Sequence, residues 1–331
     1  MILGIDIGGA NTKIVSSDGS FAELHYLPLW KESNLLDLLI DVKKRTNPYA
    51  VGVVMTGELS DAFESKEEGI QYIYNTVNEV FPEAKYLTVD FSFQNDISGD
   101  VNRFFAANWA ASSSYVSLLK KDVIFVDMGS TTTDIIPISD GVVLAEKSDY
   151  KRLMSNQLIY AGVLRTNVAC MVQEFALGSA QCKSASELFA ITADVYLLLE
   201  DITSEDYTCD VPDWYAYEGV SGKDIYSAMN RLARVVCCDI DELGEQNILS
   251  LAKQVKGRQI DDLVRSLSDI KDRFDLNSVV ACGLGEFLVE DATSILDMDC
   301  SLISKSKGRY ISLSFPAYSV AGLLEYKIRE G

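Results

Sequence analysis

Three glycine-containing turns carry the residue types that bind phosphate. The first runs from Asp6 to Lys13, as Asp-Ile-Gly-Gly-Ala-Asn-Thr-Lys, directly after a short apolar strand. Glycine in a tight turn lets backbone N–H groups approach an anion that a side chain would keep away. Asp6 could hold a hydrated Mg²⁺. The phosphate-binding candidates are Gly8, Gly9, Asn11, Thr12 and Lys13. Taken alone, the segment fits an ordinary hairpin with solvated polar residues equally well.

A second turn repeats this pattern from Asp127 to Asp134. It reads Asp-Met-Gly-Ser-Thr-Thr-Thr-Asp, with four consecutive hydroxyl side chains that can donate to phosphate oxygens. The phosphate-binding candidates are Gly129, Ser130, Thr131, Thr132 and Thr133. Asp127 would share the metal with Asp6. Two copies of one device indicate a weak internal duplication, which would place both turns at one cleft.

The third turn runs from Ala281 to Glu286 and opens a helix. Amide donors and the positive end of a helix dipole suit a phosphate or nucleotide, which makes Gly283 and Gly285 candidates for substrate or nucleotide binding. A plain strand–turn–helix joint would also explain them.

Three other polar side chains are candidates for the substrate site. Glu58 and Asp61 follow the end of the strand Ala50 to Thr56, where cleft residues collect in such sheets, although they could merely cap the next segment. The guanidinium of Arg165 could clamp a diphosphate or carboxylate, and a structural ion pair explains it equally well.

Composition excludes several classes of function. The chain of 331 residues has 49 acidic and 29 basic side chains, for a net charge of −20, which disfavours nucleic acid and anionic membrane surfaces as partners. His25 is the single histidine, so a multi-histidine metal centre is excluded. No apolar run has the length of a membrane span, and the seven cysteines indicate reduced thiols. We therefore expect a cytoplasmic protein.

Hydrophobic periodicity predicts an α/β protein of two lobes. Residues 1–120 read as three strands followed by alternating helices and strands, with helices at Lys66 to Val80 and Asp100 to Leu119. The second lobe, residues 121–331, contains a helix-prone insertion at about 173–239, including Ala185 to Glu200. Its later elements are helices at 241–255 and 261–274, a strand at 278–282, and a closing helix at 318–329 that we expect to pack back on lobe one.

The three turns in this order resemble the acetate and sugar kinase/Hsc70/actin superfamily, which has two phosphate motifs and an adenosine motif. The resemblance implies a duplicated actin-like ATPase, ribonuclease H-like fold. Ser98 to Arg103 also resembles type III pantothenate kinase, which uses an aspartate at this place as general base, so Asp100 is the base candidate and a helix N-cap role is the alternative. Bulky Leu284 departs from the small residues of the adenosine motif, which favours a diphosphate substrate over ATP.

A closer resemblance covers nearly the whole chain. The segments Asp6 to Lys13, Met55 to Asp61, Ala107 to Ser112, Asp127 to Asp134 and Tyr160 to Thr166 are similar to the hydantoinase/oxoprolinase-like proteins, and within them to the methanofuran biosynthesis condensing enzyme family. That resemblance implies a Mg²⁺-dependent transferase. It would join an aminomethylfuran-methyl diphosphate to the phenol of γ-glutamyltyramine and release pyrophosphate.

Three alternatives stay open. The same turns would serve an ATP-dependent small-molecule kinase, a non-catalytic nucleotide-binding protein, or an ATP-coupled amide hydrolase. ATP consumption would indicate the kinase, whereas pyrophosphate release without ATP would indicate the transferase. The oligomeric state is also open, a homo-oligomer included.

Overall fold

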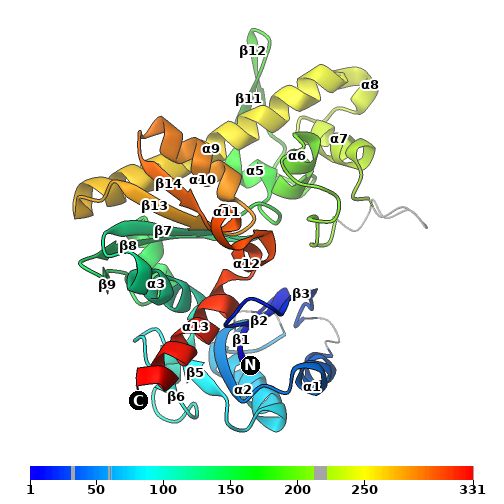
Figure 1. The fold of residues 1–331 in the computed structure, drawn as a ribbon. Coiled ribbons are helices and arrows are strands. Elements are labelled where there is room, and N and C mark those ends of the chain that lie inside the picture. Colours follow the sequence, from blue (N-terminus) through cyan, green and yellow to red (C-terminus); the bar gives the residue numbers. More distant parts are fainter. Residues whose placement is uncertain (31–33, 59, 61, 212–221, 331) are drawn as a thin grey trace.

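The computed structural model describes residues 1–30, 34–58, 60, 62–211 and 222–330. Its first sheet has the strand order β3-β2-β1-β4-β5-β6 (Figure 1). The strands are β1 (Ile2–Gly8), β2 (Asn11–Ser16), β3 (Ala22–Tyr26), β4 (Ala50–Thr56), β5 (Lys85–Leu87) and β6 (Phe93–Gln94). β2 runs antiparallel to β1, whereas β4 lies parallel to β1 and β5 parallel to β4.

A second sheet repeats that arrangement. It is formed by β7 (Val123–Met128), β8 (Thr133–Ser139), β9 (Val142–Val143), β10 (Leu158–Ile159), β13 (Ser278–Cys282) and β14 (Asp299–Leu302). β8 is antiparallel to β7, and β13 and β14 continue parallel on the other side, so β8-β7-β13-β14 copies β2-β1-β4-β5. This duplicated topology confirms the predicted actin-like ATPase fold.

Helices cover both faces of the first sheet. One face packs against α1 (Leu35–Thr46) and α2 (Lys66–Val80) in a core that contains Leu3 and Ile5. The other face meets α13 (Phe315–Glu330), which contacts α3 (Asn108–Leu119) as well. A Cβ on Gly4 would lie 1.8 Å from the carbonyl oxygen of Ala317, so only glycine allows β1 to approach this helix so closely.

Between β10 and β13 the second lobe carries a largely helical region. Its elements are α5 (Val168–Met171), β11 (Glu174–Leu177), β12 (Ala180–Lys183), α6 (Thr192–Leu198), α7 (Ile225–Arg234), α8 (Ile240–Leu243) and α9 (Glu245–Phe274). Side chains of α6, α7 and α9 share one apolar core with β7 and β13. Although α9 runs for 30 residues, neither it nor any other helix in the described ranges has the length and apolar character needed to cross a membrane.

Several predicted elements are wrong in detail. The helix expected at 100–119 is divided into the 3₁₀ helix η1 (Val101–Phe104) and α3, because Phe105 is extended and Ala106 adopts a left-handed φ of 47°. The two helices expected at 241–255 and 261–274 are one helix, α9. Gly257 does not interrupt it, since a single glycine within a helix costs only about 1 kcal/mol.

The remaining differences lie elsewhere in the second lobe. Of the helical stretch expected at Ala185 to Glu200, only α6 is helical, and β14 was not predicted at all. The lobe is completed by α4 (Asp149–Met154), α10 (Glu286–Ile295), α11 (Ile303–Lys307) and α12 (Arg309–Leu313).

Candidate active site

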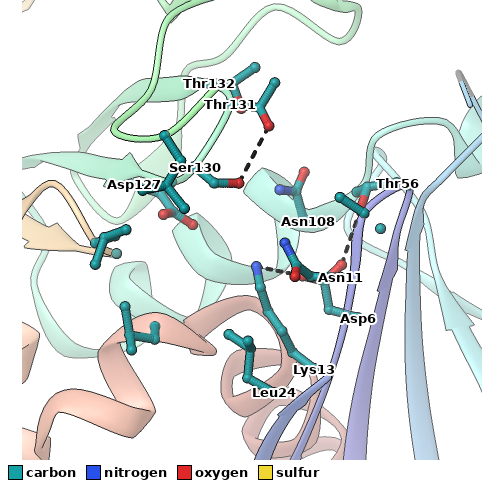
Figure 2. A pocket seen from close by; sticks show the side chains of 18 of the residues that line it. Asp6, Asn11, Lys13, Leu24, Thr56, Asn108, Asp127, Ser130, Thr131 and Thr132 are labelled. Carbon is teal, nitrogen blue, oxygen red and sulfur yellow. Dashed lines mark hydrogen bonds and ion pairs between the residues drawn. The ribbon is translucent and has the colours of Figure 1, made fainter. Parts of the chain in front are cut away.

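A cleft of about 1180 Å³ lies between the two sheets, where β1, β4, β7 and β13 end. Figure 2 shows part of its lining, with Asp6 and Lys13 on one side and Asp127 and the hydroxyl residues on the other. Most of the predicted site residues line this cleft: Asp6, Gly8, Gly9, Asn11, Lys13, Glu58, Asp127, Gly129, Ser130, Thr131, Thr132, Arg165 and Gly283. The duplicated turns therefore converge on one site.

The first turn brings a cation to the cleft. Lys13 Nζ lies 3.1 Å from Asp6 Oδ2, and Thr56 Oγ1 donates to Asp6 Oδ1 at 3.2 Å. Burial disfavours the charge of Lys13, but Asp6 and Asp127 together outweigh it and raise the lysine pKa above its usual value. Lys13 is thus a firmly charged donor. Thr12, in contrast, is fully buried and does not line the cleft, because neighbouring strand residues point to opposite faces.

The second turn is braced from behind by the segment around Gly162. The N–H groups of Val163 and Leu164 donate to the carbonyl oxygens of Gly129 and Ser130, both at 3.0 Å. A Cβ on Gly162 would lie 2.5 Å from the carbonyl carbon of Ser130, so glycine permits this contact. The bracing turns the hydroxyl residues at 130–132 toward the cleft.

Thr133 differs from the three hydroxyl residues before it. Its Oγ1 donates to the carbonyl oxygen of Ala161 at 2.8 Å, and the residue is not part of the cleft lining. The prediction that Thr133 binds phosphate directly is therefore wrong for this geometry, since its hydroxyl proton is already used.

The carboxyl of Asp127 is half-buried at the cleft, with Lys13, Asp134 and Asp6 as its charged neighbours. Burial raises its pKa to about 7; Lys13 opposes that rise, whereas Asp134 and Asp6 add to it. In the described residues, no three His, Cys, Asp or Glu side chains are grouped as a complete metal site. A Mg²⁺ ion would still fit, because Mg²⁺ commonly takes one or two carboxylates and completes its shell with water and substrate phosphates.

Glu58 is a buried acid in the cleft wall, and one of its two carboxyl oxygens has no hydrogen-bond partner. It is 2% exposed, and its Oε2 has no hydrogen-bond partner. Burial raises its pKa to about 7, nearby Asp149 adds to the rise, and Lys66 opposes it. A carboxylate with a pKa near neutrality at a cleft wall is suited to accept a proton. Asp61, its companion in the sequence prediction, lies outside the described residues.

Comparisons with known proteins identify the family. The model of the hydantoinase/oxoprolinase family matches residues 50–327. The chain is 39% identical over 339 residues to the (4-{4-[2-(gamma-L-glutamylamino)ethyl]phenoxymethyl}furan-2-yl)methanamine synthase of Methanocaldococcus jannaschii, covering 99% of this chain and 98% of that one. The synthase of the same name from Methanococcus vannielii is 35% identical over 216 residues, covering 63% and 94%. The chain belongs to the hydantoinase/oxoprolinase family. It is an enzyme.

Solved structures are similar to this family member over their whole length. A ROK family glucokinase from Streptomyces griseus has 13% identity and a TM-score of 0.49, with 97% of this chain and 98% of that one covered. Component A of the (R)-2-hydroxyglutaryl-CoA dehydratase from Acidaminococcus fermentans has 12% identity and a TM-score of 0.48, covering 100% and 99%.

In this hydantoinase/oxoprolinase family member, the third turn is closed to ligands at its two glycine amides. The N–H of Gly283 donates to Ser312 Oγ at 3.0 Å, and that of Gly285 donates to the carbonyl oxygen of Met128 at 2.9 Å. Gly285 does not line the cleft. The predicted nucleotide motif therefore acts here as a strand–turn–helix joint.

The helix that follows this turn supplies its own anion. The carboxylate of Glu286, in the first turn of α10, accepts from Ser304 N at 3.0 Å and from Ser312 Oγ at 2.6 Å, and the residue is buried. A carboxylate at a helix N-terminus offsets the positive end of the dipole. The attraction of this helix for a bound phosphate is correspondingly reduced.

The predicted base, Asp100, lies outside the main cleft. It is exposed, its Oδ1 accepts from the backbone N–H of Asn102 at 3.1 Å and from Asn102 Nδ2 at 2.6 Å, and it caps η1. Together with Arg103 it lines a separate hollow of about 520 Å³. The cap alternative describes its local role.

Two contacts across the cleft were not anticipated from the sequence. The guanidinium of Arg165 lies over the ring of Trp30, 4.9 Å from its centroid, and Tyr26 OH donates to Asp210 Oδ2 at 2.9 Å. Arg152 forms a buried ion pair with Asp134 and lies over Trp109. In the sequence, only Asp134 at the end of the second turn could have suggested this ion pair, and its partner Arg152 lies 18 residues further along the chain.

Proposed function

We propose that this enzyme joins a furanylmethyl diphosphate to the phenol of γ-glutamyltyramine and releases pyrophosphate, a step of methanofuran biosynthesis. The printed name of the 39% identical relative describes a furan and a phenol joined through a methylene ether. One observation supports the proposal for this chain: the two turns predicted to bind phosphate face one cleft, while the two glycine amides of the third turn are occupied internally. That combination suits a diphosphate better than a nucleotide.

The proposed step balances as a displacement at carbon. The phenol oxygen forms a bond to the furanylmethyl carbon, the bond from that carbon to the diphosphate oxygen breaks, and pyrophosphate leaves with the electron pair. Glu58 takes the phenolic proton. Lys13 and the hydroxyls of Ser130 and Thr131 neutralise and orient the leaving group. A Mg²⁺ ion held by Asp127, with Asp6 nearby, would neutralise further charge on the diphosphate.

The direct test uses the whole chain with the furanylmethyl diphosphate, γ-glutamyltyramine and Mg²⁺. We expect release of pyrophosphate in equal amount to the ether product, detected by mass spectrometry, with no ATP present. Phosphorylation of the acceptor on addition of ATP, without reaction of the diphosphate, would contradict the proposal and favour the kinase.

The role of Glu58 is tested by Glu58→Gln. Loss of a general base lowers kcat by about 10²–10⁴-fold. Activity of the parent enzyme should fall as pH drops through about 7, since Glu58 then gains a proton; the charged groups that influence it are Lys66 on α2 and Asp149 on α4. Glu205→Gln, which changes an acid of the same cleft, is the matched control. If the activity of Glu58→Gln still falls below about pH 7 as it does in the parent enzyme, a group other than Glu58 causes that fall.

The same variant has a stability readout that needs no substrate. Because the native pKa of Glu58, about 7, lies above the ordinary 4.5, the folded state loses stability as pH rises between these values. At about 1.4 kcal/mol per pH unit this loss is about 3 kcal/mol, and glutamine does not incur it. Urea unfolding at pH 8 should therefore show Glu58→Gln to be the more stable protein, and at pH 4.5 the difference should vanish.

A further inference from the structure

A second hollow beside the cleft concentrates positive charge in an acidic protein. It measures about 520 Å³, and its twelve lining residues include four cations, Lys66, Arg103, Lys147 and Lys151, and three acids, Asp90, Asp100 and Asp149. The chain as a whole carries a net charge of −20. A hollow with a small excess of cations and both signs of charge suits a ligand that itself carries both signs.

Two of these cations are already paired within the hollow. Arg103 Nε lies 2.8 Å from Asp90 Oδ2, and Lys147 makes an ion pair with the other oxygen of the same carboxylate. Neither Lys66 nor Lys151 forms an ion pair with a carboxylate in the described part of the chain. Lys66 is also the first residue of α2, where the helix dipole disfavours a cation. Both lysines are thus available to an incoming carboxylate.

The hollow also offers a partner for an ammonium group and an apolar wall. Asp100 accepts both bonds from Asn102 through Oδ1, which leaves Oδ2 as an acceptor. Val89, Phe105 and Ala106 supply apolar surface, and the Phe105 ring centroid lies 5.3 Å from Lys66 Nζ. Opposite charges beside apolar surface fit an amino acid group attached to a hydrocarbon chain.

The hollow and the main cleft meet next to Glu58. Ala106 and Asp149 line both spaces. Lys66 of the hollow and Asp149 both act electrostatically on Glu58, which lines the main cleft. A ligand anchored in the hollow could therefore extend past Ala106 and present its far end to the buried carboxyl.

We propose that this hollow binds the zwitterionic amino acid head of the γ-glutamyl acceptor, with Lys66 and Lys151 on its carboxylate and Asp100 on its ammonium group. The inference rests on the proposed function for the identity of the acceptor. It assigns Asp100 to acceptor binding, and it explains how one substrate is oriented with its phenol toward Glu58 while the diphosphate occupies the two turns.

The test is a titration of the whole chain with γ-glutamyltyramine, with Mg²⁺ and inorganic pyrophosphate present. The double variant Lys66→Gln, Lys151→Gln should bind it at least about tenfold more weakly, because hydrogen bonds to a charged group are lost. Its preference for γ-glutamyltyramine over 4-ethylphenol, which lacks the head, should fall by the same factor. Lys66→Arg with Lys151→Arg should retain affinity. Lys44→Gln removes an exposed lysine of α1 as the matched control.

Two results would overturn the inference: unchanged affinity in the double glutamine variant, or an equal loss for both ligands. Each single variant and a melting curve separate a binding effect from unfolding. Pyrophosphate release by the parent enzyme is measured on the same preparation. If the parent enzyme releases pyrophosphate but acceptor binding does not depend on the two lysines, the hollow is not the acceptor site and the proposed reaction stands. If binding depends on the lysines but no pyrophosphate is released, the proposed reaction is wrong and the hollow remains a binding site.

Discussion

The two hairpins that meet at the cleft share a backbone but not a charge pattern. In the β1–β2 hairpin, Asp6 lies opposite Lys13, whereas in the β7–β8 hairpin the equivalent Asp127 lies opposite Asp134. The first aspartate is therefore neutralised within its own hairpin. The second aspartate has an acid opposite it instead of a cation, and that acid, Asp134, is itself paired with Arg152.

This difference teaches that a duplicated turn need not duplicate its chemistry. Asp6 and Lys13 form an ion pair at the cleft, whereas Asp127 has no such partner in its own hairpin, and its pKa is raised to about 7, chiefly by burial. The negative charge near Asp127 can be balanced by Lys13 and by a cation that enters with the substrate. Under the proposed function, the first hairpin would supply the cation for the diphosphate, and Asp127 of the second would supply a carboxylate for Mg²⁺.

The largest effect should come from neutralising the two aspartates in turn. Asp127→Asn should lower turnover by about 10²–10³-fold, because electrostatic stabilisation of the leaving group is lost. It should not destabilise the fold, since burial and two nearby acids disfavour the charged carboxylate of Asp127 in the folded state. Asp6→Asn should lower both rate and melting temperature, because half-buried Lys13 loses its ion-pair partner at a cost of about 1–3 kcal/mol.

Turnover at saturating Mg²⁺ and thermal unfolding measure the two effects. The exposed Asp140→Asn, at the turn after β8, is the control. Equal melting temperatures for the variants at 6 and 127 would break the comparison.

An intermediate effect is expected when the cation of the first hairpin is removed. Lys13→Gln should raise the KM for the furanylmethyl diphosphate about tenfold, because one charged hydrogen bond to a phosphate oxygen is lost. The affinity for the phenolic acceptor should change far less. Steady-state kinetics with each substrate varied in turn separates the two, with Lys44→Gln as reference. An equal loss for both substrates would place Lys13 outside a phosphate-specific role.

The smallest effect is expected at two further equivalent positions of the hairpins, Thr12 and Thr133. Thr12 lies opposite Ile7 and Thr133 opposite Met128 in their hairpins. Thr12 Oγ1 is buried without a hydrogen-bond partner, whereas Thr133 Oγ1 donates to Ala161. Thr133→Val should therefore cost about 1 kcal/mol of unfolding free energy, and Thr12→Val should be neutral or stabilising. Urea denaturation checks the sign, and a similar loss in both variants would contradict it.

Local patterns were sufficient where an element depends on its own residues. The helix at Lys66 to Val80 and the strand at Ser278 to Cys282 have the predicted bounds, because each combines clear hydrophobic periodicity with a capping or glycine signal at its end. The expected helix at 100–119 failed because Phe105 is extended and Ala106 is left-handed, and neither residue type signals such a break in the sequence.

The choice of a general base shows that local sequence patterns are also insufficient for the candidate site. Asp100 and Glu58 are both acids near the start of a predicted segment, and their types alone do not distinguish them. In the structure the first is exposed and caps η1, whereas the second is buried with an unpartnered oxygen. Burial depends on residues far apart in the chain, so the sequence did not reveal that Glu58 lines the main cleft whereas Asp100 lines the neighbouring hollow.

By itself, the sequence determined the duplicated strand–turn–strand pattern, the two glycine-containing turns at one cleft and the exclusion of a multi-histidine metal centre, because these depend on residue type and short spacing. Only the tertiary structure decided which donors remain free and which acids carry a shifted pKa. The amides of Gly283 and Gly285 are satisfied by Ser312 and Met128. Such contacts join segments distant in the chain, and desolvation of a carboxyl is a property of everything packed around it.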